Sequence, residues 1–329
     1  MKKNTLGYQG KLSREDFENI LRKTKEFRNF DKWKIKTLNI GEMTHTYILQ
    51  KGKKKYFSKE VKLHEAQVNY FLYKLKLRHL PYSLFPKLLK KGILIMPNID
   101  GKMLRKKQLD INLLKDFIKF QNKMNNRAYF EKHNTTKLNN YSQSEDGFFA
   151  KNLYDNFKEC KKNLLKLKKK YKLKIIQDFL ELLNLISINK EGIIKDFVSM
   201  PFTRQHHDFR EDNIIVNNGG QFLIDWGSSY GYGPFMYDYA EFLVDNQKAL
   251  NIVINKSKIC KNICLITIER WLYVSLIAKM LNMLRWYIQK GHHNIETKKN
   301  VKKLLEHEYK TYKVLLKLND IKKIHSQKK

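Results

Sequence analysis

The sequence predicts an α+β fold in two parts, a small antiparallel sheet with one helix and then a mainly helical region that carries a β-hairpin. Three observations indicate this. Short runs rich in β-branched and aromatic residues lie at 33–61 and 91–101. Apolar residues recur at helical spacing over most of 104–190 and 260–318. Between the helical stretches, Asn218-Gly219 joins two short strand-like runs, which is a strong hairpin signal.

Length and composition limit the class of protein. The chain has 329 residues, of which 42% are hydrophobic and 12% aromatic. This suits a two-lobed enzyme or two ordinary domains with a large core, and excludes a mostly disordered chain. The net charge is +34, yet only ten of the 66 basic residues are arginine. The charge fits either a nucleic-acid-binding surface or the lysine-rich composition of an AT-rich genome. The second is favoured, because specific phosphate and base contacts prefer arginine.

Cysteine content and hydrophobic patterning bear on the cellular location. Cys160, Cys260 and Cys264 are too few for a disulfide framework, so we expect a reducing, cytoplasmic compartment. Cys260 and Cys264 are spaced to share a helix face, but no second ligand pair accompanies them, which argues against zinc. The N-terminal stretch has no apolar region typical of a secretory signal. The apolar stretch 265–288 contains four charged residues, so we expect a core helix and no membrane span.

The chain divides into three regions. Residues 1–30 predict an N-terminal helical extension, residues 31–97 a small sheet domain, and residues 98–329 a mainly helical domain. In the last region the polar run 133–147 predicts a loop. The basic run 161–174 predicts a solvated helix face, with nucleic acid as the alternative partner. The expected elements of the sheet domain are strands at 33–41, 44–50, 53–61 and 91–101 and a helix at 62–78.

The chemistry of the chain is concentrated in one segment, 206–238. With a two-residue turn at Asn218-Gly219, Asn213 and Asp225 lie at the open end of one hairpin, and Asp208 lies on the loop before it. Oxygen ligands of this kind suit Mg²⁺. A nearby carboxylate can orient a substrate hydroxyl and accept its proton, which is the arrangement that phosphoryl transfer needs. The turn predicts three facing pairs, Asn217 with Gly220, Ile215 with Phe222 and Asn213 with Ile224.

The spacing His206-x-Asp208-x-x-x-x-Asn213 resembles the catalytic loop of the aminoglycoside phosphotransferase and choline kinase family, which has a protein-kinase-like, two-lobed fold. Ile224-Asp225-Trp226 is similar to the metal-binding motif of that family. Pro234 and Asp238 resemble the stretch that follows it. The resemblance implies a kinase that moves the γ-phosphoryl group of ATP, or of GTP, to a hydroxyl of a small molecule with Mg²⁺. It assigns Asp208 as the base or hydroxyl orienter, and Asn213 and Asp225 as metal ligands.

The resemblance also implies a nucleotide site in the sheet domain. The run 40–49 is similar to the glycine-bearing phosphate loop and assigns Gly41 and Thr44 to the nucleotide, although Glu42 stands where the family has a second glycine. Lys59 would grip the α- and β-phosphates. Glu65, on the following helix, would hold that lysine. Glu60 is adjacent to Lys59 on the same strand and would point to the other face.

The remaining assignments concern the lobe linker and the catalytic loop. The resemblance places the adenine ring against the backbone from Met96 to Asn98, and Pro97 between them has no N–H to donate. Arg210 would either stabilise the γ-phosphate charge or form an ion pair with Glu211 or Asp212. His206 is expected to support the loop, and Asp238 to cap or brace its helix and the catalytic loop rather than to contact substrate.

The sequence leaves the acceptor open among a choline-like amino alcohol, a sugar or a related metabolite. Aromatic residues after the hairpin could form a cation cage or belong to the core. Glu241 and Asp245 are the nearby acidic pair, which is little for a polycationic aminoglycoside. Two alternatives remain on a kinase scaffold, a nucleic-acid-binding protein and a pseudokinase that acts by interaction. The aromatic residues are Trp226, Tyr230, Tyr232, Trp271, Tyr273 and Trp286.

Overall fold

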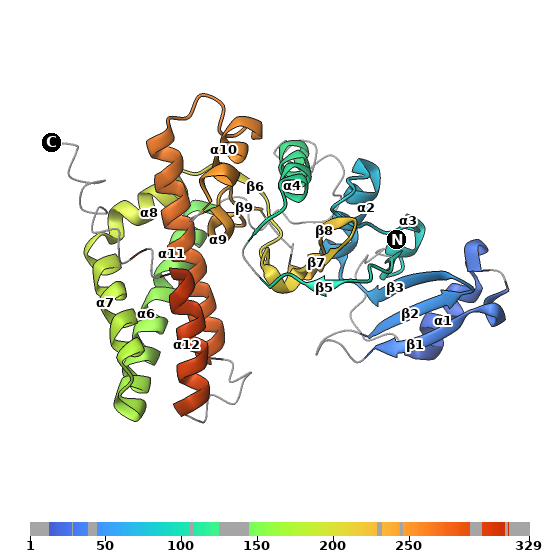
Figure 1. The fold of residues 1–329 in the computed structure, drawn as a ribbon, viewed down its shortest axis with the longest axis horizontal. Helices are drawn as coiled ribbons and strands as arrows, with labels where there is room; N and C mark the ends of the chain where they lie inside the picture. Colours follow the sequence, from blue (N-terminus) through green and yellow to red (C-terminus); the bar gives the residue numbers. More distant parts are fainter. Residues whose placement is uncertain are drawn as a thin grey trace, which may run out of the picture. The chain divides into compact units, whose positions relative to one another are not determined.

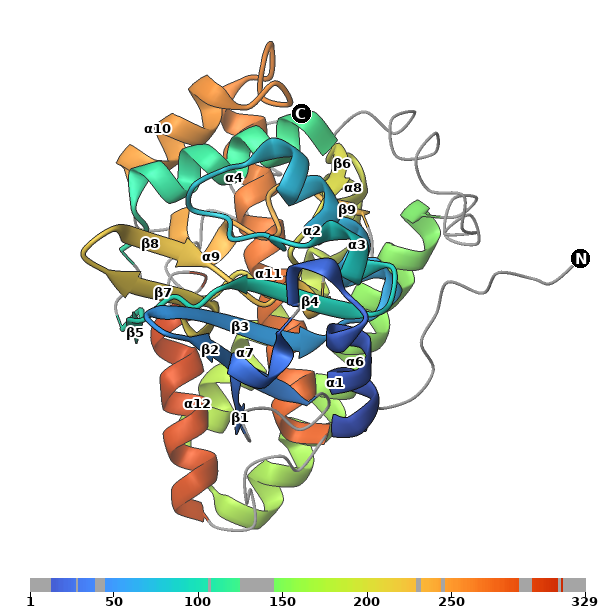
Figure 2. The same cartoon turned by 90° about the vertical axis from the view of Figure 1, so that its right-hand side faces the viewer.

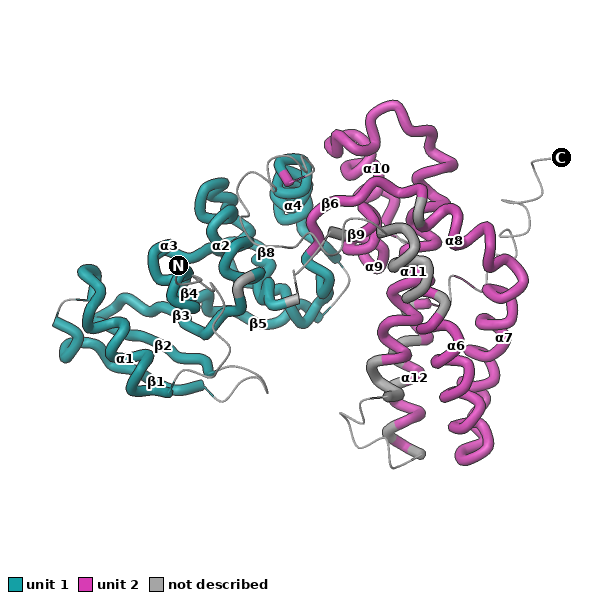
Figure 3. Tube along the Cα trace, turned by 180° about the vertical axis from the view of Figure 1, so that it is seen from behind, with its two compact units in different colours: residues 1–123, 206–230 teal, residues 124–205, 231–329 magenta. Residues whose placement is uncertain are grey.

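The structure is a computed structural model, and its described residues form two compact units. Unit 1 comprises residues 1–123 and 206–230, and unit 2 comprises residues 124–205 and 231–329 (Figure 3). The hairpin segment therefore packs with the small sheet, although the predicted lobe boundary at residue 97 stays a prediction. The described residues are 13–27, 29–38, 45–105, 108–124, 145–228, 232–243, 246–289, 298–312 and 315.

Unit 1 contains a four-stranded antiparallel sheet in the order β1-β2-β3-β4 (Figure 2). All four predicted strands are confirmed, and Gly52 makes the tight turn between β2 and β3 with a φ of 57°. The helix predicted after β3 is also confirmed. The elements are β1 (Lys34–Leu38), β2 (Thr46–Lys51), β3 (Lys54–Glu60), α2 (Leu63–Leu75), α3 (Pro86–Leu89) and β4 (Ile93–Pro97).

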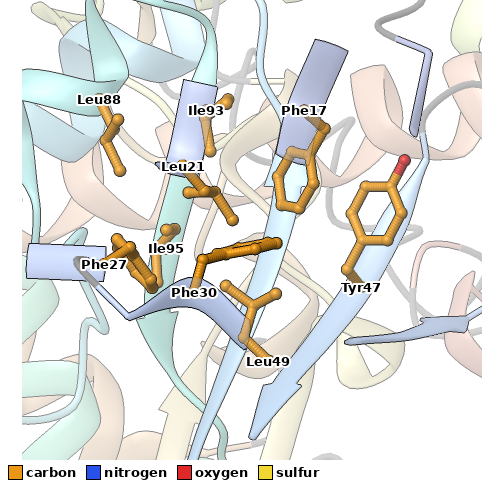
Figure 4. Close-up of a cluster of buried hydrophobic side chains, with 9 residues drawn as sticks. All are labelled: Phe17, Leu21, Phe27, Phe30, Tyr47, Leu49, Leu88, Ile93 and Ile95. Atoms are coloured by element: carbon orange, nitrogen blue, oxygen red, sulfur yellow. The ribbon is translucent and has the colours of Figure 1, made fainter. Parts of the chain in front are cut away.

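One face of this sheet packs on the N-terminal segment, as Figure 4 shows. Helix α1 (Arg14–Arg22) begins at Ser13, whose side chain accepts the N–H of Asp16 at 3.0 Å. Phe17 on α1 stacks on Tyr47 of β2 with ring centroids 4.2 Å apart. The predicted N-terminal helix is therefore part of the sheet's core. Two 3-10 turns follow it, η1 (Lys25–Phe27) and η2 (Phe30–Lys32). The buried cluster consists of Phe17, Leu21, Phe27, Phe30, Tyr47, Leu49, Leu88, Ile93 and Ile95.

The opposite face of the sheet packs on α2 and on the segment after the hairpin. Phe57 of β3 and Ile224 both contact the cluster of buried residues on this face. Side chains alternate along a strand, so Lys59 emerges on the same face as Phe57. Glu60 emerges on the other face, where it is buried. There the pKa of Tyr47 is raised, mainly by the burial of Tyr47 itself and also by the negative charge of Glu60. The cluster consists of Val61, Ala66, Leu89, Leu94 and Met96.

The predicted hairpin forms the second sheet of unit 1, in the order β5-β7-β8. Asn217 lies opposite Gly220 and Ile215 opposite Phe222, so the predicted register is confirmed. The hairpin strands predicted from the sequence run over 213–217 and 220–225, and their limits at the open end are wrong. Asn213 ends a 3-10 turn because its side chain hydrogen-bonds back to the loop, and the second strand stops before Asp225. The elements are β5 (Lys102–Met103), η4 (Glu211–Asn213), β7 (Ile214–Asn217), β8 (Gly220–Leu223) and η5 (Trp226–Ser228).

Strand β5 was not predicted, and a glycine permits its pairing with β7. A Cβ atom on Gly101 would lie 2.5 Å from the carbonyl oxygen of Val216 and 2.5 Å from Cγ2 of Ile215. Only glycine lets the two backbones approach this closely. The remaining helix of this region is α4 (Ile111–Met124), part of the helical stretch predicted from residue 104.

Unit 2 is mainly helical, and its long helices α6, α7, α11 and α12 pack side by side (Figures 1 and 2). Helices cover most of the described parts of the stretches predicted as helical, but residues 108–110 and 260–264 precede α4 and α11 and are not helical. Most of the loop predicted at 133–147, residues 133–144, lies outside the described residues. Its last three residues, 145–147, belong to α6, which begins at Glu145. The elements are α6 (Glu145–Tyr171), α7 (Lys174–Ile188), α8 (Lys190–Val198), β6 (Phe202–Arg204), β9 (Tyr232–Pro234), α9 (Ala240–Leu243), α10 (Gln247–Lys256), α11 (Leu265–Gln289) and α12 (Lys298–Tyr312).

The three cysteines are free. Cys160 and Cys260 are buried and Cys264 is exposed. The expectation that Cys260 and Cys264 could share a helix face is wrong, because both precede the first residue of α11. Within the described ranges, no helix combines the length and the apolar character needed to cross a bilayer.

Candidate active site

The predicted catalytic loop is a tight turn that Asn213 closes. Its Nδ2 atom donates to the backbone oxygen of Asp208 and to the Oδ2 atom of the same residue, each at 2.7 Å. The Asn213 N–H donates to the backbone oxygen of Arg210 at 3.0 Å. Asn213 is buried, whereas the Asp208 side chain is 36% exposed and accessible to solvent. With Nδ2 committed to Asp208, Oδ1 is the atom of Asn213 that can bind a metal ion.

His206 connects this loop to the end of the hairpin. The residue is fully buried, and its Nε2 atom donates to the backbone oxygen of Ile224 at 2.9 Å. Its ring also packs edge-on against Trp226, with centroids 4.6 Å apart. Just after β8, the Ile224 N–H donates to the backbone oxygen of Asn213 at 2.9 Å. Asp208, Asn213 and the residue before Asp225 are thus tied together, as the predicted register requires.

Asp225 has a left-handed backbone, with a φ of 58°. Aspartate tolerates this region better than most residues, but it still needs support from its surroundings. The Oδ1 atom accepts a hydrogen bond from Lys59 Nζ at 2.7 Å. Burial is the largest influence and raises the pKa of the Asp225 carboxyl. The charge and hydrogen bond of Lys59, with smaller contributions from His206 and Gly227, together lower this pKa by more, so the net shift is downward. Asp225 is therefore an anion at neutral pH, as a metal ligand should be.

Lys59 bridges two carboxylates from distant parts of the sequence. Its Nζ atom lies 2.7 Å from Glu65 Oε1 and 2.7 Å from Asp225 Oδ1. Burial lowers the pKa of Lys59, but the two carboxylates together raise it by more, so the ammonium stays charged. Glu65 on α2 is thus the partner of Lys59, and Glu60 is on the opposite face of the sheet, as predicted.

Arg210 contacts the proposed base. Its Nε atom lies 3.3 Å from Asp208 Oδ1, and one terminal nitrogen lies 3.2 Å from Asp212 Oδ2. The predicted ion pair with Asp212 is present, and the pair with Asp208 was not predicted. The guanidinium holds a positive charge within reach of the catalytic loop.

The linker after β4 differs from the prediction in its hydrogen bonding. The Asn98 N–H donates to the Lys55 oxygen at 3.2 Å, so this N–H is not the expected donor beside Pro97. Along an antiparallel strand, the backbone N–H and C=O of one residue face the paired strand, and those of the next residue face away from it. The Ile95 oxygen faces away from β3 and accepts the N–H of Leu84. By the same alternation, the oxygen of Pro97, the last residue of β4, faces away from β3. Met96 is buried against the α2 face of the sheet.

Several predicted site residues cannot be placed or belong to the core. Gly41 and Thr44, assigned to the phosphate loop, lie outside the described residues, as do Tyr230 and Asp245. Trp226 is 2% exposed and packs against Phe120 with ring centroids 4.9 Å apart. Trp226 is therefore core and does not line a cage.

Two more of the predicted acceptor residues are engaged within unit 2. Trp271 is buried, and its Nε1 atom donates to Ser199 Oγ at 3.1 Å. Glu241 Oε1 accepts the Tyr312 hydroxyl at 2.9 Å and lies 3.9 Å from Lys279 Nζ. Glu241 therefore already has a cation and a hydroxyl beside it.

Sequence reasoning missed Gly227. A Cβ atom there would lie 3.2 Å from Asp225 Oδ1 and 3.7 Å from Glu65 Oε2, so a side chain would press on both carboxylates. The signal was a glycine two residues after Asp225, the aspartate predicted to bind the metal.

Comparison with known proteins gives consistent results. A sequence profile described as "Phosphotransferase enzyme family" (APH) matches residues 29–252. The choline kinase of Cryptosporidium parvum Iowa II matches at 14% identity and a TM-score of 0.53, covering 95% of this chain and 98% of the other. The Plasmodium vivax ethanolamine kinase matches at 14% identity and a TM-score of 0.51, covering 89% and 87%. No protein of curated function matches in sequence. The shared fold confirms the predicted kinase-like α+β class.

Proposed function

Because the chain belongs to the phosphotransferase enzyme family, we propose that it transfers the γ-phosphoryl group of a nucleoside triphosphate to a hydroxyl of a small molecule, with Mg²⁺. The observation that supports this most strongly is the position of Lys59. A lysine of the small sheet lies 2.7 Å from a helix glutamate and 2.7 Å from an aspartate 166 residues further along the chain. A buried cation between two carboxylates costs desolvation, so function explains its presence better than stability does.

The residues at the end of the hairpin fit a magnesium ion. Asn213 offers its Oδ1 atom and Asp225 an ionised carboxylate, which is the small share of oxygen ligands that a protein supplies to Mg²⁺ beside a nucleotide. When bound, Mg²⁺ neutralises charge on the phosphate oxygens. Lys59 remains protonated and can bind phosphate as a point charge. Gly41 and Thr44 are proposed to contact the same phosphates through the loop before β2.

Asp208 is proposed to orient the acceptor hydroxyl and to take its proton. Asn213 holds one oxygen of the Asp208 carboxylate at 2.7 Å, which fixes its direction. Arg210 lies 3.3 Å from the other oxygen. The arginine is placed to offset negative charge that builds up near the carboxylate as the hydroxyl is phosphorylated. The chain's own residues thus position and neutralise, and no covalent intermediate is needed.

We propose ATP over GTP on the chemistry of the linker. The outward Pro97 oxygen can accept from an amino group, and the Ile99 N–H, two residues further on, is proposed to donate to a ring nitrogen. Adenine offers this order of donor and acceptor on its N6 and N1 atoms, whereas guanine offers the reverse on O6 and N1. We therefore propose ATP as the main phosphate donor, with Met96 and Asn98 shaping the linker around these two groups.

An amino alcohol is the first acceptor class to test. Two solved structures that share the fold are called a choline kinase and an ethanolamine kinase, which supports this choice. Glu241 already contacts Tyr312 and lies near Lys279, so a polycationic aminoglycoside is less favoured. Sugars and related hydroxyl compounds remain the second class.

Acceptor-dependent nucleotide turnover tests the proposal. Choline, ethanolamine, sugars and aminoglycosides would be supplied with ATP or GTP to the wild type, to Asp208→Asn, and to Asp31→Asn as a surface control. We expect ADP formation that depends on one acceptor class, a loss of at least about a hundredfold in Asp208→Asn, and no change in Asp31→Asn. Turnover that needs no acceptor, or that survives in Asp208→Asn, would contradict the proposal.

A further inference from the structure

His64 links helix α2 to the segment that follows Asp225. The residue is half-buried in the first turn of α2, immediately before Glu65. Its Nε2 atom lies 2.7 Å from the backbone oxygen of Gly227. A carbonyl oxygen can only accept, so Nε2 carries the hydrogen and donates. One helix turn therefore holds both the glutamate that binds Lys59 and a donor to the metal-binding segment.

Gly227 contacts the site through both of its backbone groups. Its carbonyl accepts from His64, and its N–H hydrogen-bonds the Asp225 carboxylate. A side chain at this position would come within 3.2 Å of Asp225 Oδ1. A shift of Gly227 is therefore transmitted directly to the carboxylate that is proposed to bind Mg²⁺.

The backbone of Asp225 needs support from both directions. Its φ of 58° is a conformation that most side chains avoid, so neighbouring contacts must hold it. On the preceding side, Ile224 is held by hydrogen bonds to Asn213 and His206. On the following side, the hydrogen bond from His64 to Gly227 is the matching backbone anchor.

We propose that His64 is a positioning residue, which fixes Gly227 and thereby orients the Asp225 carboxylate toward the metal ion. The proposal rests on the proposed function of Asp225. It also couples the metal site to α2, because His64 and Glu65 are consecutive. The helix that positions Lys59 for phosphate thus positions the metal ligand as well.

The test measures ADP binding by titration calorimetry over a series of Mg²⁺ concentrations, together with the melting temperature. His64→Phe keeps the ring without the donor, His64→Ala removes the side chain, and His64→Gln restores an N–H at a similar reach. His79→Ala is a matched control, since His79 also lies in unit 1 and its ring hydrogen-bonds Asp116 at 2.9 Å.

Loss of one such hydrogen bond should weaken the apparent Mg²⁺ affinity about three- to tenfold in His64→Phe and His64→Ala. His64→Gln should stay within about twofold of the wild type on the same reasoning. His79→Ala should lower the melting temperature but leave the Mg²⁺ dependence unchanged. If His64 had a purely structural role, its variants would behave like His79→Ala, with a lower melting temperature and an unchanged Mg²⁺ dependence. That result would overturn the proposal.

The outcomes separate this proposal from the function on which it rests. If the wild type binds ADP with no dependence on Mg²⁺, the proposed function itself fails. If the wild type depends on Mg²⁺ and the Phe and Ala variants bind the ion as the wild type does, only the role of His64 is wrong. Equal weakening in the Gln variant would also overturn the role, because the donor would then be irrelevant.

Discussion

Replacing Lys59 by methionine would leave the Glu65 carboxylate buried without its cation. In the native protein the two charged atoms lie 2.7 Å apart, and the side chains are only 12% and 6% exposed. A carboxylate in such surroundings is more stable when neutral. We therefore expect the Lys59→Met protein to take up a proton at Glu65 when it folds.

The free-energy cost of keeping Glu65 protonated sets how much stability the Lys59→Met protein loses. The ordinary pKa of glutamate is 4.5, so at about 1.36 kcal/mol per pKa unit, holding the proton costs roughly 3 kcal/mol at pH 7 and under about 1 kcal/mol at pH 5. Burial already raises the pKa of Glu65, despite the opposing effect of Lys59, and loss of Lys59 raises it further. Stability from a raised pKa is present below the unfolded pKa and lost as pH rises. The variant should therefore lose stability, relative to the wild type, from pH 5 to pH 7.

Urea denaturation followed by circular dichroism at pH 5, 6 and 7 measures this effect. The double variant Lys59→Met/Glu65→Gln removes both charges and should recover most of the stability that the single variant loses at pH 7. Two results would refute the reasoning. One is a loss of equal size at pH 5 and pH 7, and the other is a double variant no more stable than Lys59→Met.

Three further changes test separate parts of the structure. Gly101→Ala places a methyl group 2.5 Å from the backbone of β7, and should lower the free energy of unfolding by about 1–3 kcal/mol in urea titrations; unchanged stability would contradict the close β5–β7 approach. In Arg210→Lys the single ammonium cannot contact both Asp208 and Asp212, as the guanidinium does. The kcat should therefore fall about tenfold or more at an unchanged melting temperature; a normal kcat would exclude a transition-state role. Gly227→Ala should weaken the apparent Mg²⁺ affinity several-fold in ADP-binding titrations, because its methyl group presses on Asp225; wild-type affinity would show that the contact is relieved elsewhere.

Local signals predicted the parts of the fold that depend on neighbouring residues. The Asn218-Gly219 turn alone determined which residues face each other across β7 and β8. The family resemblance assigned Glu65 to Lys59, and strand alternation excluded Glu60 as the partner. The register and the exclusion of Glu60 need only the geometry of one hairpin and one strand, so tertiary packing could not overturn them.

The parts that were missed depend on contacts between distant segments. Strand β5 has two residues and exists because Gly101 admits β7, which no local pattern reveals. The Asn98 N–H is used by Lys55, which lies 43 positions earlier in the chain and becomes its neighbour only through sheet pairing. The hydrogen bond from His64 to Gly227 joins residues 163 positions apart. Such pairs become visible only once the chain is folded.

The aromatic residues show the same limit. Trp226 and Trp271 are residues of the type that forms cation cages. Both are buried in cores, where large aromatic rings contribute most to stability. Sequence spacing does not distinguish the two uses, because the same helical and loop positions can face a cavity or a core.

The Mg²⁺ dependence of nucleotide binding tests the central claim most directly. Calorimetric titration of ADP, with and without Mg²⁺, would compare the wild type with Asp225→Asn and with the surface control Asp31→Asn. The account predicts that Asp225→Asn folds normally yet loses at least about tenfold, or 1.4 kcal/mol, of the Mg²⁺-dependent affinity, while Asp31→Asn matches the wild type. Wild-type Mg²⁺-dependent binding in Asp225→Asn would show that this carboxylate does not hold the metal, and would contradict the account.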